Sequence, residues 1–182
     1  MKGMIMKHIC PRRPLFLPIL ILCLAAFVSC GGATYRSDLT SASVMNTVTA
    51  AIPAEDGYAA TSEGYINASM WGERYQALLD AVTDYTILIS GDSAMNVDEL
   101  GIFRVKEGGD VKAATAIVKE YVEAQALRHK GLLEAYNPDE LPKTENRKVT
   151  VCGSYILYSI LGNSETAKAH EAFEAALKMA KS

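Results

Sequence analysis

Asp98 and Glu99 are two adjacent carboxylates whose residue type suggests chemistry, because glycoside hydrolases work with a pair of carboxylates. Such a pair must flank one bond, with its carboxyl groups about 5 to 9 Å apart. Adjacent residues of a strand point to opposite faces, so these two acids cannot form that pair with each other. The alternative interpretation is that both acids stand at the start of a strand, exposed to solvent or bonded to a turn.

His129 and Tyr136 follow on a predicted long helix, where His129 lies on or beside the apolar stripe. A histidine in this position has two interpretations: a catalytic or ligand-binding group, or a residue at the edge of the core with a local hydrogen bond. We therefore take Asp98, Glu99, His129 and Tyr136 together as a candidate surface for a ligand or partner.

The other catalytic patterns are incomplete. Gly91-Asp92-Ser93 after a predicted strand is similar to the nucleophile motif of one group of lipases and esterases, but that group also needs an aspartate three residues before a C-terminal histidine. Ala167 occupies that position before His170, so a turn is the better interpretation. We expect no catalytic residues and a protein that is not an enzyme.

The sequence predicts neither a metal site nor a cofactor. His129 and His170 lie far apart on different predicted helices, and no spacing typical of zinc, calcium or phosphate binding occurs. Cys152 is in an apolar run, where a thiol acts as a small buried apolar group. A reactive thiolate would need a nearby base, and none is evident.

Cys30 follows a segment that is typical of a secretory signal. Its first part is basic, residues 1–29 contain no acid, and the fifteen residues from Pro14 to Val28 carry no charge. An uncleaved membrane anchor is the alternative interpretation. However, the run is shorter than the about 20 residues of a spanning helix, and Pro14 and Pro18 weaken a helix there.

Phe27-Val28-Ser29-Cys30 resembles the lipobox of bacterial lipoproteins, with Phe27 in place of the usual leucine. The resemblance implies a diacylglyceryl group on the Cys30 sulfur and an anchor in the cell membrane, on the extracytoplasmic face. We therefore expect a signal peptide over residues 1–29, a lipidated tether over 30–37, and one domain over 38–182. Two acyl chains suffice for stable anchoring, whereas one gives marginal binding.

The charge of the mature chain argues against nucleic acid as a partner. Four of the 18 basic residues and none of the 21 acidic residues precede Cys30, so the mature chain has a net charge of −7. An acidic domain gains no electrostatic attraction to a phosphate backbone.

Hydrophobic periodicity predicts seven elements in the order α-α-β-β-α-β-α, which is an α+β domain with a small, mainly antiparallel sheet packed against helices. The predicted helices cover residues 40–52, 73–82, 110–136 and 164–181, and the strands cover 85–90, 98–106 and 148–161. In the second strand, Leu100 and Ile102 face one side while Glu99 and Phe103 face the other. The third strand reads as one long central strand, and residues 54–69 as mostly loop.

Three segments carry a resemblance to an uncharacterised lipoprotein family, domain of unknown function 4358. They are the Asp-Glu-hydrophobic strand within Ser93–Phe103, the aromatic-x-Pro helix end within Glu134–Glu140, and the glycine-aromatic strand Val149–Leu157. The resemblance covers about residues 80–180. It implies a lipid-anchored protein of anaerobic Gram-positive bacteria, and no activity.

Two functions remain compatible with the sequence. The first is a non-enzymatic binding or adaptor module of the cell envelope, whose partner is an unknown envelope protein or a small ligand. The alternative is a small envelope enzyme that acts on peptidoglycan or its fragments, with polar residues converging in a cleft near Asp98, His129 or Tyr136.

Overall fold

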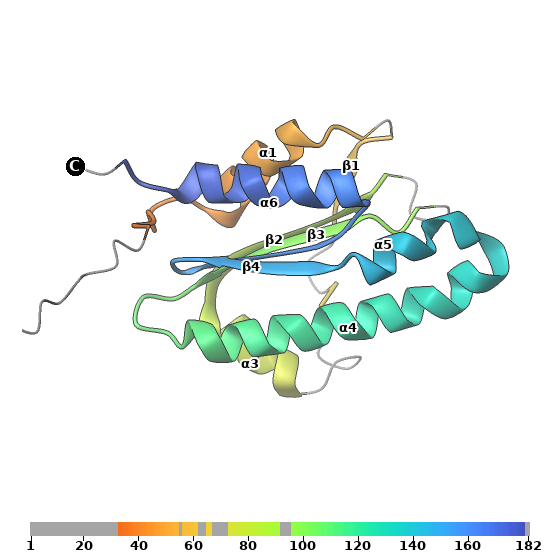
Figure 1. Cartoon of the computed structure of the whole chain (residues 1–182). Coiled ribbons are helices and arrows are strands. Elements are labelled where there is room, and N and C mark those ends of the chain that lie inside the picture. Colours follow the sequence, from red (N-terminus) through yellow and green to blue (C-terminus); the bar gives the residue numbers. More distant parts are fainter. Residues whose placement is uncertain (1–32, 55, 62–64, 67–72, 92–95, 181–182) are drawn as a thin grey trace, which may run out of the picture. The chain divides into compact units, whose positions relative to one another are not determined.

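Five antiparallel strands form one sheet between two layers of helices in this computed structural model (Figure 1). The structure describes residues 33–54, 56–61, 65–66, 73–91 and 96–180, and the predicted signal peptide and Cys30 lie outside them. The strand order is β1-β2-β3-β5-β4. The strands are β1 (Tyr58–Ala60), β2 (Val82–Ser90), β3 (Glu99–Val105), β4 (Lys148–Cys152) and β5 (Tyr155–Ile160).

Helices α1 and α6 cover one face of the sheet, and α3 and α4 cover the other (Figure 1). A short α5 and the 3-10 helix η1 connect α4 to β4. The described helices are α1 (Ser41–Ala51), α3 (Glu73–Ala81), α4 (Val111–Tyr136), η1 (Pro138–Glu140), α5 (Leu141–Glu145) and α6 (Asn163–Leu177). The predicted α+β class and its antiparallel sheet are confirmed.

Local sequence signals account for the helix starts. The Thr40 hydroxyl accepts a hydrogen bond from Ser43 N at the start of α1, and the Asp110 carboxylate accepts one from Ala113 N at the start of α4. Each cap satisfies a backbone donor that has no partner within the helix. The predicted helices at both places are therefore confirmed.

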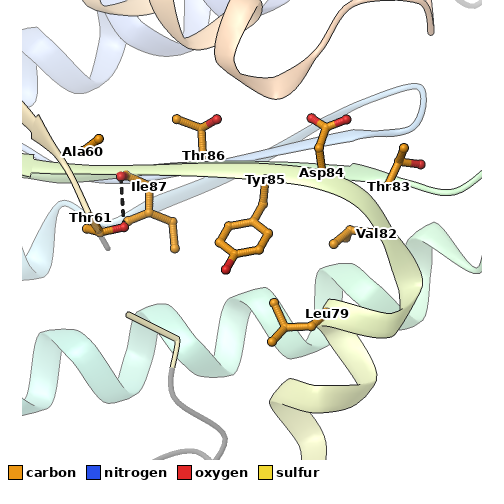
Figure 2. A pocket seen from close by; sticks show the side chains of 9 residues that line it. All are labelled: Ala60, Thr61, Leu79, Val82, Thr83, Asp84, Tyr85, Thr86 and Ile87. Atoms are coloured by element: carbon orange, nitrogen blue, oxygen red, sulfur yellow. Dashed lines mark hydrogen bonds between the residues drawn. The ribbon is translucent and has the colours of Figure 1, made fainter. Parts of the chain in front are cut away.

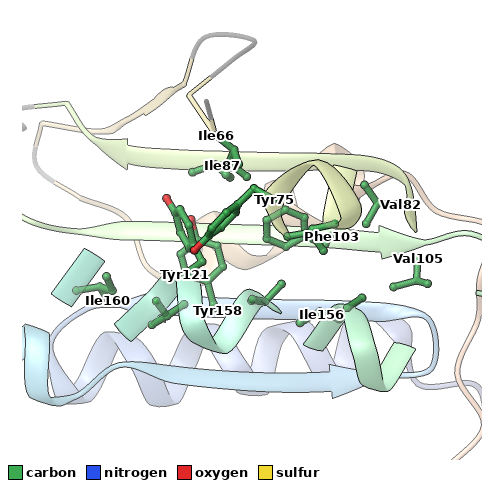
Figure 3. Packing of buried hydrophobic residues seen from close by; sticks show 14 of the residues in the cluster. Ile66, Tyr75, Val82, Ile87, Phe103, Val105, Tyr121, Ile156, Tyr158 and Ile160 are labelled. Carbon is green, nitrogen blue, oxygen red and sulfur yellow. The ribbon is translucent and has the colours of Figure 1, made fainter. Parts of the chain in front are cut away.

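The faces predicted for β3 are also confirmed. Leu100 and Ile102 pack in the core beneath α1 and α6, whereas Phe103 and Val105 pack in the core beneath α4. Both cores consist of buried side chains, and Figure 3 shows the one beneath α4. Burial on both faces explains why most residues of β3 and β5 are apolar or aromatic.

One predicted strand is wrong. Residues 148–161 form two antiparallel strands, β4 and β5, joined by a two-residue turn in which Gly153 has φ +60°. Val151 pairs with Ile156, so it shares the α4 face with that residue rather than the opposite face with Tyr155. Strand β1 was not predicted, because residues 54–69 were expected to be mostly loop.

Candidate functional site

Glu99 lies at the centre of a buried hydrogen-bond network, although the sequence predicted an exposed or turn-bonded acid. Its side chain is 2% exposed. The hydroxyls of Tyr121 and Tyr158 donate to Oε1 over 2.5 and 2.7 Å. On the other oxygen, Tyr65 donates over 3.2 Å and Gln125 Nε2 over 3.3 Å. We call these five residues the Glu99 network.

The environment keeps these hydroxyls protonated, so they act as donors. Burial, together with the nearby Glu99 carboxylate, raises the pKa of Tyr158 and Tyr121 well above the ordinary value. For Tyr65 the same causes raise the pKa to about 12. Figure 3 shows Tyr121 and Tyr158 side by side between the sheet and α4, with ring centroids 5.3 Å apart. The network therefore joins β3, β5 and α4, and its donors enclose the carboxylate.

Asp98 points the other way, as the alternation of a strand predicts. Its carboxylate lies 2.8 Å from Lys143 Nζ, which also lies 2.8 Å from Glu140. Asp98 N further donates to Asn96 Oδ1 over 2.9 Å. This acid therefore ties the start of β3 to η1 and α5, and the interpretation as a turn-bonding acid holds for Asp98 but not for Glu99.

His129 and Tyr136 do not join the two acids in one cleft. Burial lowers the pKa of the half-buried His129, and the Glu99 charge acts in the opposite direction. Tyr136 is 83% exposed at the end of α4, eleven residues beyond Gln125. At 1.5 Å per residue, this is about 16 Å along the helix axis. The four predicted residues are therefore dispersed.

A serine–histidine contact that the sequence did not predict lies on the other face of the sheet. Ser159 Oγ is 2.9 Å from His170 Nε2, and His170 Nδ1 is 2.7 Å from Thr150 Oγ1. Burial, with a smaller effect of Lys148, lowers the pKa of His170 to about 4. Ser159 is fully buried, so its hydroxyl is not available to a substrate. The three residues form a structural contact between β4, β5 and α6.

Among the residues that the structure describes, no strand pairs with the outer edge of β2 over its first half, and we call this part the open edge. β1 pairs with β2 only from Leu88 to Ser90, and Thr61 N adds one bond to Ile87 O. No other strand of the described residues pairs with this edge. Residues of an antiparallel strand alternate between its two neighbours. Because Ile87 O faces β1, the backbone N–H and C=O of Tyr85 face the open edge.

A cavity of about 480 Å³ lies along this edge (Figure 2). Its two sides differ in chemistry, because alternate β2 side chains point to opposite faces of the sheet. The α3 and α4 side presents mainly apolar groups, with the Thr61 hydroxyl bonded to Ile87 O, and the α1 side presents small and polar groups. The lining residues are Ala60, Thr61, Leu79, Val82, Thr83, Asp84, Tyr85, Thr86 and Ile87. We call this feature the β2 edge site.

The one acidic side chain that lines the β2 edge site, Asp84, is already paired with a basic side chain. Asp84 accepts hydrogen bonds from Arg104 Nε over 2.7 Å and from Ser41 N over 2.6 Å. Burial alone would raise the pKa of Asp84, but the Ser41 and Arg104 contacts outweigh it and the pKa is lowered. The site therefore offers hydrogen-bonding groups and apolar surface without an unpaired ion, a chemistry that suits a polypeptide backbone.

Metal sites and membrane-spanning helices are absent from the described residues. These residues contain no group of three or more histidine, cysteine or acidic side chains able to hold a metal. Within the same part of the chain, no helix combines the length and the apolar composition needed to cross a bilayer. Cys152 is a buried free thiol, as its apolar sequence context predicted.

The structure is an α+β domain with a five-stranded antiparallel sheet, helices on both faces and a buried carboxylate. Residues 65–161 match the family described as a domain of unknown function, DUF4358, and the chain belongs to this family. The matched region spans the whole Glu99 network and strands β2 to β5. No curated protein and no solved structure matches the chain.

Proposed function

We propose that the chain is a lipid-anchored lipoprotein of the cell envelope whose domain binds an extended polypeptide segment at the β2 edge site. It acts as a non-enzymatic binding or adaptor module. The observation that carries the proposal is the open edge of β2, where no strand of the described residues pairs with the N–H and C=O of Tyr85, beside a cavity of about 480 Å³. An added strand satisfies such groups, which is how peptides extend the sheet of many binding domains.

The chemistry of the site defines the sequence pattern of the bound segment. Leu79, Tyr85 and Ile87 lie on one side of the edge, and Thr83 and Thr86 on the other (Figure 2). A strand added here places alternate side chains on these two sides. The bound segment therefore alternates apolar residues, which enter the cavity, with polar residues, which face the threonine hydroxyls.

The anchor is supported by the sequence. A basic start, an apolar run and the lipobox-like Phe27-Val28-Ser29-Cys30 lead to a diacylglyceryl group on Cys30. The protein is then held at the extracytoplasmic face of the cell membrane. Replacing Cys30 by serine tests this directly. The variant should accumulate as an unprocessed precursor, and the mature wild-type protein should carry the mass of the lipid.

Peptide binding tests the β2 edge site. The probe is a ten-residue peptide with alternating apolar and polar residues, and its control has the same composition with the apolar residues at positions 1, 4, 5, 8 and 9. We expect fluorescence anisotropy with the full-length protein in detergent to show binding of the alternating peptide alone. Equal binding of both peptides, or binding of neither across a library of alternating sequences, would contradict the proposal.

A further inference from the structure

The folded domain begins within four residues of Cys30. Thr34 O accepts a hydrogen bond from Met179 N over 2.8 Å, and Arg36 N donates to Leu177 O over 2.9 Å. Between them, Tyr35 forms an isolated β-bridge with Lys178. Residues 34–36, which were predicted to be part of the tether, are thus bound to the end of α6.

Further contacts fix this segment to the sheet. Tyr155 donates from its hydroxyl to Leu39 O over 2.6 Å. Tyr35 packs against the β4–β5 turn so closely that a Cβ on Gly153 would lie 3.1 Å from its own Cβ. The described chain is therefore fixed to the domain from Thr34 onward, and only three residues separate Thr34 from Cys30.

The number of residues between Cys30 and Thr34 limits the distance between the domain and the bilayer. Cys30 and Thr34 are four residues apart, which is at most about 14 Å when fully extended. The headgroup zone of one leaflet is itself about 5 to 8 Å thick. We infer that the end of the domain around Thr34 and Met179 lies against the lipid headgroups of the membrane. This inference rests on the lipid anchor proposed above.

Several turns share this end of the domain. The β4–β5 turn at Gly153 and Ser154 lies beside the end of β3, because Val105 N donates to Ser154 O over 2.9 Å. The β3–α4 turn and the C-terminal end of α6 lie at the same end of the sheet (Figure 1). Met179 is 49% exposed there. These segments form the membrane-facing surface.

Charge does not account for this orientation. Arg36 pairs with Asp38 over 2.7 Å, and Lys178 lies 3.9 Å from Glu174, so these two basic groups have acidic neighbours. An electrostatic contact would need a cluster of unpaired basic residues. The short tether therefore sets the orientation, which should be the same on neutral lipid and at high salt.

Fluorescence quenching on vesicles tests the orientation. Met179→Cys and the control Leu127→Cys are labelled with a fluorophore in the full lipidated protein, where Cys152 is buried. Leu127 is 70% exposed on α4, sixteen residues and about 24 Å from the start of the helix. On phosphatidylcholine vesicles with headgroup spin labels, we expect at least threefold stronger quenching at position 179. Equal quenching at both positions, or none at either, would overturn the inference.

A variant with a longer tether shows whether the tether or the membrane-facing surface causes the quenching at position 179. Twenty glycine and serine residues inserted after Gly32 add about 25 Å of mean reach, so quenching at position 179 should fall to the level at position 127. Persistent quenching would mean that the surface itself binds headgroups, which contradicts the role of the tether. Flotation with the vesicles is measured in parallel. A protein that fails to float disproves the anchor, whereas one that floats without the quenching difference disproves only the orientation.

Discussion

Gly101 lies directly opposite Tyr158 in the β3–β5 pair, and the tyrosine ring occupies the space where a side chain at position 101 would stand. A Cβ on Gly101 would lie 1.9 Å from Cε1 of that ring. The glycine thus allows the ring to cross β3 and its hydroxyl to reach Glu99 over 2.7 Å. The bond between Tyr158 and Glu99 therefore requires a glycine at position 101.

We therefore expect Gly101→Ala to destabilise the protein by about 3 kcal/mol, because the core has no room for the added methyl group. The matched control is Gly131→Ala in α4, where a Cβ meets nothing within 4 Å. Alanine favours a helix interior, so this control should gain about 0.5 to 1 kcal/mol. Urea unfolding followed by circular dichroism measures both. Equal midpoints for Gly101→Ala and the wild type would contradict the packing described for Tyr158.

Removing the buried Glu99 carboxylate should lower the free energy of unfolding more than removing a carboxylate on the surface. Glu99→Ala leaves the hydroxyls of Tyr121 and Tyr158 buried without their acceptor, and we expect a loss of about 3 to 5 kcal/mol. Glu107→Ala, in the exposed β3–α4 turn, should change the free energy of unfolding by less than about 0.5 kcal/mol. Similar effects of the two substitutions would show that the Glu99 network does not hold the fold.

His170 should make the stability fall in mild acid. Its pKa is about 4 in the folded protein, against an ordinary value of 6.5, so the unfolded chain takes up the proton more readily. The stabilisation from neutral His170 is complete above about pH 6.5 and is lost as the pH falls to 4, with a total of about 3 kcal/mol. His170→Gln does not titrate. Unfolding free energies between pH 7 and 4 should therefore fall less steeply for the variant, and equal slopes would contradict the assignment.

A charge in the cavity should weaken binding at the β2 edge site. Leu79→Lys places an ammonium group on its apolar side, and we expect at least tenfold weaker binding of the alternating peptide, because an apolar anchor contributes about 1.5 to 3 kcal/mol. Leu127→Lys makes the same change on the exposed surface of α4. Anisotropy titrations compare the two. Unchanged affinity for Leu79→Lys, or an equal loss for both, would place the peptide elsewhere.

The sequence predicted the fold class and the faces of β3, because both follow from local periodicity. It missed the division of residues 148–161 into two strands for a definite reason. The turn at Gly153 and Ser154 has two residues, so the apolar alternation of β4 continues into β5 without a break. The pattern is then the same as that of one long strand.

The candidate site could be predicted from the sequence only in part. The alternation of side chains along a strand correctly predicted that Asp98 and Glu99 face opposite sides. It did not predict the residues that bury Glu99. Its three tyrosine donors come from three different segments. Tyr65 precedes α3, Tyr121 lies in α4 and Tyr158 lies in β5. The β2 edge site also escaped prediction, since an open edge depends on where β1 ends and not on the residues of β2.

The central claim is that the open edge of β2 accepts a strand, and amide hydrogen exchange at Tyr85 tests it most directly. The N–H of Tyr85 faces the open edge, so it should exchange rapidly in the free protein. With the alternating peptide bound, we expect its exchange to slow at least tenfold, while the amides of the central strand β5 stay unchanged. An unchanged rate at Tyr85 under saturating peptide, with slowing elsewhere on the domain, would contradict strand addition at β2.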